Sequence, residues 1–155
     1  MGCNGGNPAF SYIHILNYGG IESEASYPYE AIDGKCKFNF TNIEMTCNGI
    51  GNIIDNEESL KHAVAKIGPI SALLLVNENL QHYDSGIYYI PDCKSSNVVH
   101  SILIIGYGTD NDLKQDYWLI KNSFGSNWGE NGYIRMARNG NNNCTIILFA
   151  YYPLT

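Results

Sequence analysis

Two polar residues at the ends of apolar segments could carry chemistry together. His100 interrupts the apolar run 98–105, and Asn122 directly follows the apolar run 117–121. An asparagine oxygen that accepts an imidazole N–H fixes the tautomer and leaves the other ring nitrogen for a nucleophile. If that nucleophile is a cysteine, the imidazolium stabilises the thiolate and lowers the thiol pKa. Taken singly, the two residues are more simply a hydrogen-bonded core histidine and an amide that caps a turn.

The elements that would position these residues are short apolar strands. We expect a helix at 9–18 after Asn7-Pro8, an ordered loop at 22–40, and an amphipathic helix at 56–67 that stops at Gly68-Pro69. The predicted strands are 50–54, 70–76, 98–105, 117–121, 132–137 and 146–151. The N-terminal quarter of the chain is thus predicted to be helix and loop. An antiparallel β region that carries one helix follows it, which is an α+β pattern.

Composition excludes several classes of function. The 155 residues carry a net charge of −6 without a basic block, so nucleic acid and anionic membrane surfaces are not expected partners. No apolar run reaches the roughly 18–20 residues of a membrane helix. The five cysteines form no CxxC pair and no His pair has ligand spacing, so we expect no metal and no cofactor.

Cysteine usage indicates an oxidising compartment. Widely spaced cysteines in a chain rich in Gly and Tyr are typical of a secreted disulfide framework. Two sequons, Asn39-Phe40-Thr41 and Asn143-Cys144-Thr145, permit N-glycosylation in that compartment. The count of five leaves at least one thiol without a partner inside the chain, and the first residues do not resemble a signal peptide.

Several ordered motifs make the family recognisable. They are GCNGG at 2–6, YPY at 27–29, GPI at 68–70, SGIY at 85–88, HSILIIGYG at 100–108 and KNSFGSNWGENGY at 121–133. With these motifs the sequence resembles the papain family of cysteine peptidases, and its cathepsin L-like members most of all, over essentially its whole length. The resemblance implies a papain-like fold. Its right-hand antiparallel β-barrel domain would occupy residues 50–155, and residues 1–49 would be a remnant of the left-hand helical domain with the inter-domain loop.

The resemblance also assigns roles to residues. His100 corresponds to the general base of peptide-bond hydrolysis and Asn122 to its orienting partner, with Phe124 and Trp128 as an aromatic shield. The substrate-binding residues it implies are Gly5, Gly6, Pro8, Leu73, Val98, Val99 and Phe149. It implies a disulfide between Cys93 and Cys144 and upstream partners for Cys3 and Cys36. Cys47 does not belong to the cathepsin L-like pattern, and it could bond either Cys36 or an upstream partner.

The family's nucleophile motif does not occur in these 155 residues. In the family, a CGxCW cysteine lies about 130–150 residues before the histidine, which places it upstream of residue 1. The glutamine of the oxyanion hole belongs to the same segment. We therefore expect the C-terminal part of a lysosomal or secreted endopeptidase, inactive as an isolated chain, that acts on a peptide or protein substrate or binds an inhibitor. Without the upstream helix, Phe10 and Ile13 would face solvent.

Departures from the family pattern leave alternatives open. Val99 and Ser101 flank the histidine where the family has Asn or Asp and Gly or Ala, and Phe124 replaces an indole. Phe149 stands where a small side chain normally opens the specificity pocket, which Pro8 and Leu73 would also line. Three interpretations therefore stay open. The chain is part of a peptidase, or it is a non-catalytic relative whose cleft binds peptides, propeptide-like inhibitors or a protein partner. In the third interpretation it is a secreted structural domain without a cleft function.

Overall fold

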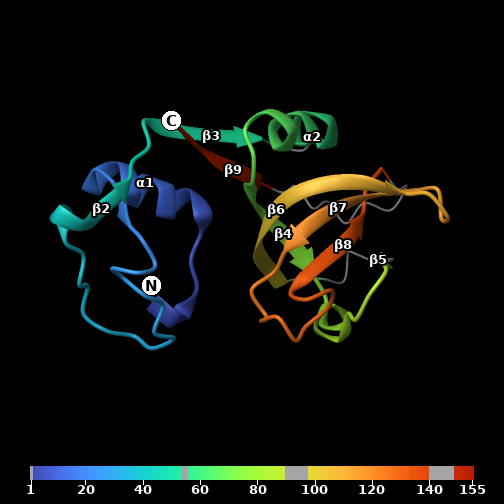
Figure 1. The fold of residues 1–155 in the computed structure, drawn as a ribbon, viewed down its shortest axis with the longest axis horizontal. Helices are drawn as coiled ribbons and strands as arrows, with labels where there is room; N and C mark the ends of the chain where they lie inside the picture. Colours follow the sequence, from blue (N-terminus) through green and yellow to red (C-terminus); the bar gives the residue numbers. More distant parts are fainter. Residues whose placement is uncertain (1, 54–55, 90–97, 140–148) are drawn as a thin grey trace. The chain divides into compact units, whose positions relative to one another are not determined.

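The computed structural model describes residues 2–53, 56–89, 98–139 and 149–155 (Figure 1). The chain forms two compact units. One contains Met1–Gly51 and Tyr151–Thr155, and the other contains Asn52–Ala150. The expected division into domains of residues 1–49 and 50–155 stays a prediction.

The first unit is built around helix α1 (Pro8–Tyr18). The Asn7 side chain caps its first turn by accepting the Ala9 N–H at 2.9 Å, and Pro8 occupies the first helical position. Gly19 ends the helix in the left-handed region, at φ 76°. Short strands β1 (Ile21–Glu22) and β2 (Ile43–Met45) pair antiparallel beside it, and 3-10 turns lie at Gly2–Asn4 and Phe40–Asn42.

No residue of α1 is buried. Phe10 is 68% exposed and Ile13 is 43% exposed, as the sequence predicted for this helix. A helix with apolar side chains in water gains nothing from tertiary packing on that side. These side chains therefore form an apolar surface of the first unit.

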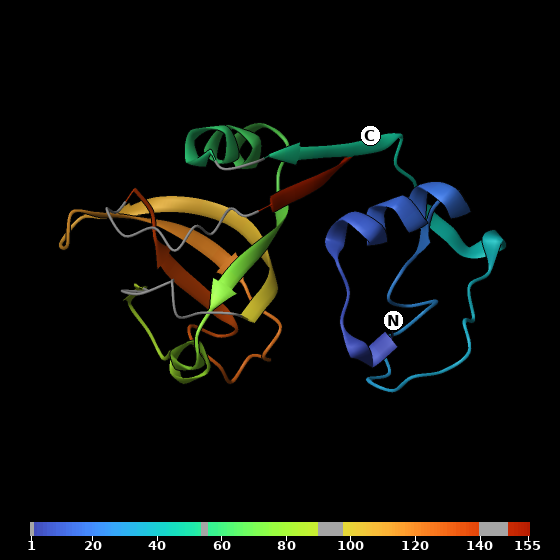
Figure 2. The same ribbon diagram turned by 180° about the vertical axis from the view of Figure 1, so that it is seen from behind.

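A seven-stranded sheet runs in the order β3-β9-β4-β6-β7-β8-β5. The strands are β3 (Gly49–Ile53), β4 (Ile70–Val76), β5 (Ile87–Tyr88), β6 (Val98–Asp110), β7 (Gln115–Lys121), β8 (Tyr133–Ala137) and β9 (Phe149–Leu154). Figures 1 and 2 show β6, β7 and β8 side by side in the second unit. The β4–β6, β6–β7 and β7–β8 pairs are antiparallel, whereas β5 pairs with β8 in parallel. The α+β prediction is confirmed.

Helix α2 (Glu57–Lys66) and the sheet share the core of the second unit. Asn56 caps α2 by accepting the Ser59 N–H at 2.8 Å. The helix buries one apolar face at helical spacing. Strands β6 and β7 bury alternate residues, whereas β4 is buried on both faces. The largest fully buried side chains are Trp118, Leu60, Ile70, Leu74, Ile104, Ile120 and Ile134.

The position of His100 on β6 explains why a histidine occurs in an apolar run. His100 pairs with Leu74 of β4, and alternation puts it on the face that carries Ile102 and Ile104, both buried. His100 itself is half-buried, because it lies near the strand end where the core opens to solvent. The imidazole is thus held by a rigid strand at the margin of the core.

The structure differs from the sequence prediction at several elements. Strand β6 extends to Asp110 and β7 begins at Gln115, so the two form a longer hairpin than the apolar runs indicate. The apolar segments end earlier because the outer part of the hairpin is solvated and polar. The sequence also gave no sign of β1, β2 or β5, which have two or three residues each.

Candidate active site

His100 and Asn122 meet across neighbouring strands. The His100 Nε2 atom lies 2.8 Å from the Asn122 Oδ1 atom. An amide oxygen can only accept, so Nε2 is the protonated nitrogen and donates this bond. The tautomer leaves Nδ1 as the ring nitrogen that can exchange a proton with a nucleophile. The two residues singled out from the sequence are therefore one hydrogen-bonded pair.

Asn122 is held by the loop that begins at the end of β7. Its backbone N–H donates to the Gly132 carbonyl at 3.0 Å, and its Oδ1 also accepts the Ser123 N–H at 2.8 Å. Two donors converging on one oxygen fix the rotamer of the amide. The Asn122 Nδ2 atom is buried and has no hydrogen-bond partner among the residues that the structure describes. The side chain is thus fixed through its acceptor alone.

Aromatic rings pack against one another in a continuous series that begins at His100. The Phe124 ring lies 5.2 Å from the His100 ring at an interplanar angle of 34°. Trp128 packs edge-on against Phe124 at 5.2 Å and donates its indole N–H to the Gln81 carbonyl. Tyr83, which is buried, packs against Trp128 at 5.4 Å. Phe124 remains 46% exposed, so a phenyl ring covers the imidazole while its outer face stays in water.

A charged clamp fastens the other end of the loop, and the sequence analysis missed it. Glu130 accepts hydrogen bonds from the Nε–H and an Nη2–H of Arg135, with a shortest contact of 2.7 Å, and one from the Gly86 N–H at 3.0 Å. Arg135 also pairs with Asp110 at 3.3 Å. The Arg135 guanidinium holds the pKa of the Glu130 carboxyl below its ordinary value. The signal in the sequence was an acidic and a basic residue around Gly132-Tyr133, but Gly86, which donates to Glu130, lies 44 positions before it.

Tyr83 joins this clamp to the aromatic rings. Its hydroxyl donates to the Gly86 carbonyl at 2.7 Å and accepts the Arg135 N–H at 3.4 Å. Burial is the main cause that raises the pKa of the Tyr83 phenol. Gly129 passes so close that a Cβ there would lie 2.7 Å from the Tyr133 carbonyl oxygen and 2.9 Å from the Tyr83 ring. Glycine at this position is therefore a packing requirement of the loop.

The residues predicted to bind substrate are divided between the units. Leu73 is buried on β4 opposite Ser101, and so shares a face with the residue after the histidine. Val98 and Val99 begin β6 and are exposed. Phe149 begins β9, the neighbour of β4, and is 42% exposed. Gly5, Gly6 and Pro8 belong to the first unit. Their grouping into one cleft stays a prediction.

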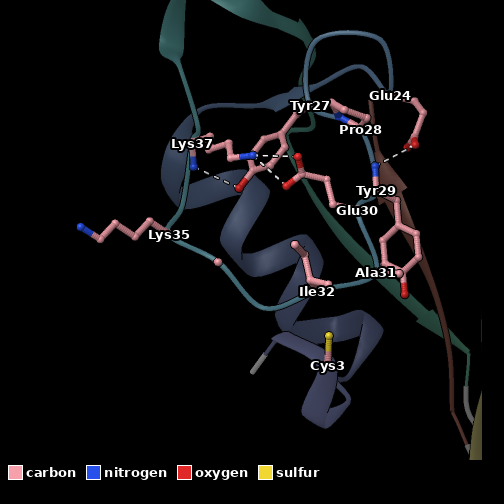
Figure 3. Close-up of a pocket in the computed structure, with 11 residues that line it drawn as sticks. Cys3, Glu24, Tyr27, Pro28, Tyr29, Glu30, Ala31, Ile32, Lys35 and Lys37 are labelled. Atoms are coloured by element: carbon pink, nitrogen blue, oxygen red, sulfur yellow. Dashed lines mark hydrogen bonds and ion pairs between the residues drawn. The ribbon is translucent and has the colours of Figure 1, made fainter.

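A separate pocket of about 420 Å³ lies within the first unit (Figure 3). Its wall includes Cys3 and the Tyr27-Pro28-Tyr29 motif, and Lys37 forms a 2.7 Å ion pair with Glu30. No histidine lines this pocket, so the Cys3 thiol has no imidazole there to take its proton. The pocket therefore offers no cysteine–histidine chemistry.

Cys3, Cys36 and Cys47 have free thiols in the structure. The suggested bond between Cys36 and Cys47 is therefore not formed. Cys93 and Cys144, the pair implied by the resemblance, lie outside the described residues. The described ranges hold no group of His, Cys, Asp or Glu suited to a metal ion. Within the same ranges no helix has the length and apolarity that crossing a membrane requires.

Comparison with known proteins places these features in a family. The sequence profile described as papain family cysteine protease matches residues 1–154. Digestive cysteine proteinase 2 of Homarus americanus is 48% identical over 158 residues, which cover 99% of this chain and 48% of that protein. Procathepsin L of Mus musculus is 46% identical over 158 residues, covering 99% of this chain and 47% of that protein.

Solved structures give the same result for the fold. Digestive procathepsin L 3 from the larval midgut of Tenebrio molitor superposes with a TM-score of 0.92 at 41% identity, covering 100% of this chain and 50% of that one. The bromelain protease of Ananas comosus, solved with the E64 inhibitor, has a TM-score of 0.87 at 37% identity, and the match covers 99% of this chain and 72% of that one. The chain spans about half the length of the curated relatives it matches. With its fold, motifs and sequence in agreement, the chain belongs to the papain family of cysteine proteases.

Proposed function

We propose that this chain supplies the general base and its orienting residue to a cathepsin L-like cysteine endopeptidase. The observation that carries the proposal is the 2.8 Å bond from His100 Nε2 to Asn122 Oδ1. Here the bond selects the tautomer, and a covered, half-buried site strengthens the electrostatic interaction between an imidazolium and a thiolate.

The chemistry follows from the two ring nitrogens. Nδ1 of His100 takes the proton of a cysteine thiol, and the thiolate attacks the carbonyl carbon of the peptide bond. The imidazolium returns the proton from Nδ1 to the leaving amine, and an acyl-enzyme thioester remains. Water then attacks the thioester while Nδ1 accepts its proton, which releases the carboxylic acid and regenerates the thiol. Throughout, Asn122 accepts the Nε2–H and keeps the ring in position.

The nucleophile in this proposal comes from outside the 155 residues. No CGxCW motif occurs in them, and Cys3 lies in a glycine-rich segment of the other unit. The proposed substrates are peptides and proteins, and the proposed location is lysosomal or secreted, as for a family that includes digestive proteinases and procathepsin L. The isolated chain should not hydrolyse peptide bonds, since it has a base but none of its cysteines stands in the nucleophile motif of the family.

The test is an activity assay on the full-length protein that contains this chain. We expect hydrolysis of a fluorogenic peptide, with the active fraction titrated by E64. His100→Ala should abolish hydrolysis. His62→Ala, which changes an exposed histidine of α2, is the matched control and should retain it. Equal activity of the two variants would contradict the proposal.

A non-catalytic binding protein is the second candidate, and Phe149 favours it. A partly exposed phenyl ring at the position implied for the specificity pocket would hinder a bulky apolar substrate residue. This candidate predicts a full-length protein that binds a propeptide-like inhibitor with unchanged affinity after His100→Ala, and that shows no hydrolysis before or after the change.

A further inference from the structure

One sequence motif has no part in the proposed chemistry. Asn39-Phe40-Thr41 is an N-glycosylation sequon in the first unit, at the 3-10 turn Phe40–Asn42. Asn39 is exposed, and its backbone N–H is fixed by the Glu22 carboxylate at 2.7 Å. Glu22 is buried, so the backbone at Asn39 is anchored while the side chain faces solvent.

The hydrogen bonds of the Asn39 side chain use its oxygen. Oδ1 accepts the Thr41 N–H at 3.0 Å and the Thr41 hydroxyl at 2.9 Å. A glycosidic bond forms at the amide nitrogen Nδ2 and leaves the amide oxygen in place as an acceptor. Modification at Nδ2 therefore preserves both bonds of this turn.

An aromatic cluster of Tyr18, Phe38 and Phe40 flanks this asparagine. The Phe38 and Phe40 rings lie 5.0 Å apart, and Tyr18 contacts them at 5.5 and 6.4 Å. Phe40 is 66% exposed, so a large apolar face stands next to the modification site. The C–H face of a sugar ring can cover such a face and remove it from water.

We propose that Asn39 carries an N-linked oligosaccharide whose first N-acetylglucosamine covers Phe40. The donor is a polyprenyl-pyrophosphate-linked oligosaccharide. The Asn39 Nδ2 atom forms a bond to C1 of the sugar, the C1–O bond to pyrophosphate breaks, Nδ2 loses one proton, and the lipid pyrophosphate leaves. This inference rests on the secretory location in the proposed function, but it makes no use of His100 or Asn122.

Peptide mapping of the secreted full-length protein tests the proposal. Trypsin releases residues 38–61, which contain Asn39, separately from the peptide after Arg138, which contains the other sequon. Deglycosylation by peptide-N-glycosidase in heavy-oxygen water should convert Asn39 to a labelled aspartate in most molecules. Thr41→Ala should abolish the label and Thr41→Ser should keep it. Asn42→Gln, beside the sequon, is the control that should change nothing.

A separate measurement tests whether the first sugar covers the Phe40 ring. Deglycosylation should increase the fluorescence of a dye that binds exposed apolar surface, and Phe40→Ser, which keeps the sequon, should remove most of that increase. An unlabelled peptide 38–61 from secreted protein would overturn the proposal, even where the protein hydrolyses peptides. A labelled Asn39 in a protein without peptidase activity would leave this inference standing and overturn the proposed function.

Discussion

Replacing Asn122 with alanine should separate catalysis from stability. The substitution removes the acceptor of the His100 Nε2–H, at 2.8 Å, and the acceptor of the Ser123 N–H, also at 2.8 Å. The first bond matters most when the ring is an imidazolium, because a hydrogen bond to a charged group is worth about 1.5–3 kcal/mol. At about 1.36 kcal/mol per tenfold in rate, kcat/KM should fall about 10- to 150-fold.

Stability should change far less, because two effects oppose each other. Alanine loses two hydrogen bonds, but it also removes the buried Nδ2 atom that has no partner in the described part of the chain. Burying an unsatisfied polar group costs about 1–3 kcal/mol. The losses and the gain are of similar size, so we expect a net change within about 1 kcal/mol, or about 4 °C in Tm.

The assay is kcat/KM on a fluorogenic peptide with active sites titrated, alongside thermal unfolding of the same preparations. Asn127→Ala is the matched control, since it changes an exposed asparagine of the same loop. It should leave both kcat/KM and Tm unchanged. The reasoning is refuted if Asn122→Ala keeps wild-type kcat/KM, or if its loss of activity is matched by a loss of Tm far beyond 4 °C, which would make Asn122 a structural residue.

Three further changes probe the rings, the pocket and the clamp. Phe124→Ala should lower kcat/KM several-fold by admitting water to the His100–Asn122 bond, while Phe124→Trp should not, as steady-state kinetics would show. Phe149→Ala should raise kcat/KM by about tenfold or more for peptides with leucine, relative to alanine, two residues before the scissile bond. If the ratio of kcat/KM for leucine peptides to that for alanine peptides stays the same after the change, Phe149 lies outside the pocket. Glu130→Gln should lower Tm by about 2–8 °C at pH 7. Partial exposure limits the contribution of the ion pair with Arg135 to the free energy of unfolding to about 1–2 kcal/mol. Arg135 lowers the pKa of Glu130 from the ordinary 4.5, so this stability is present above that pH and is lost as pH falls through the lowered pKa. The difference in Tm between wild type and Glu130→Gln should therefore shrink in acid, and a constant difference would exclude the clamp.

The sequence by itself determined much of the fold and the identity of the central pair. Apolar runs located β4, β6 and β7, because core strands carry hydrophobic side chains on each face that they bury, which is both faces in β4 and one face in β6 and β7. Asn7-Pro8 marked the start of α1 through local capping, which involves residues only two positions apart. Within its motif, Asn122 was recognisable without coordinates.

Only the tertiary structure decided how the pair is held. It selected Nε2 as the donor, packed Phe124 against His100 at an interplanar angle of 34°, and joined Glu130 to Gly86 across 44 positions. The physical reason is that ring stacking, tautomer and ion pairing depend on side chains brought together by folding, and their sequence spacing carries no period from which to predict them.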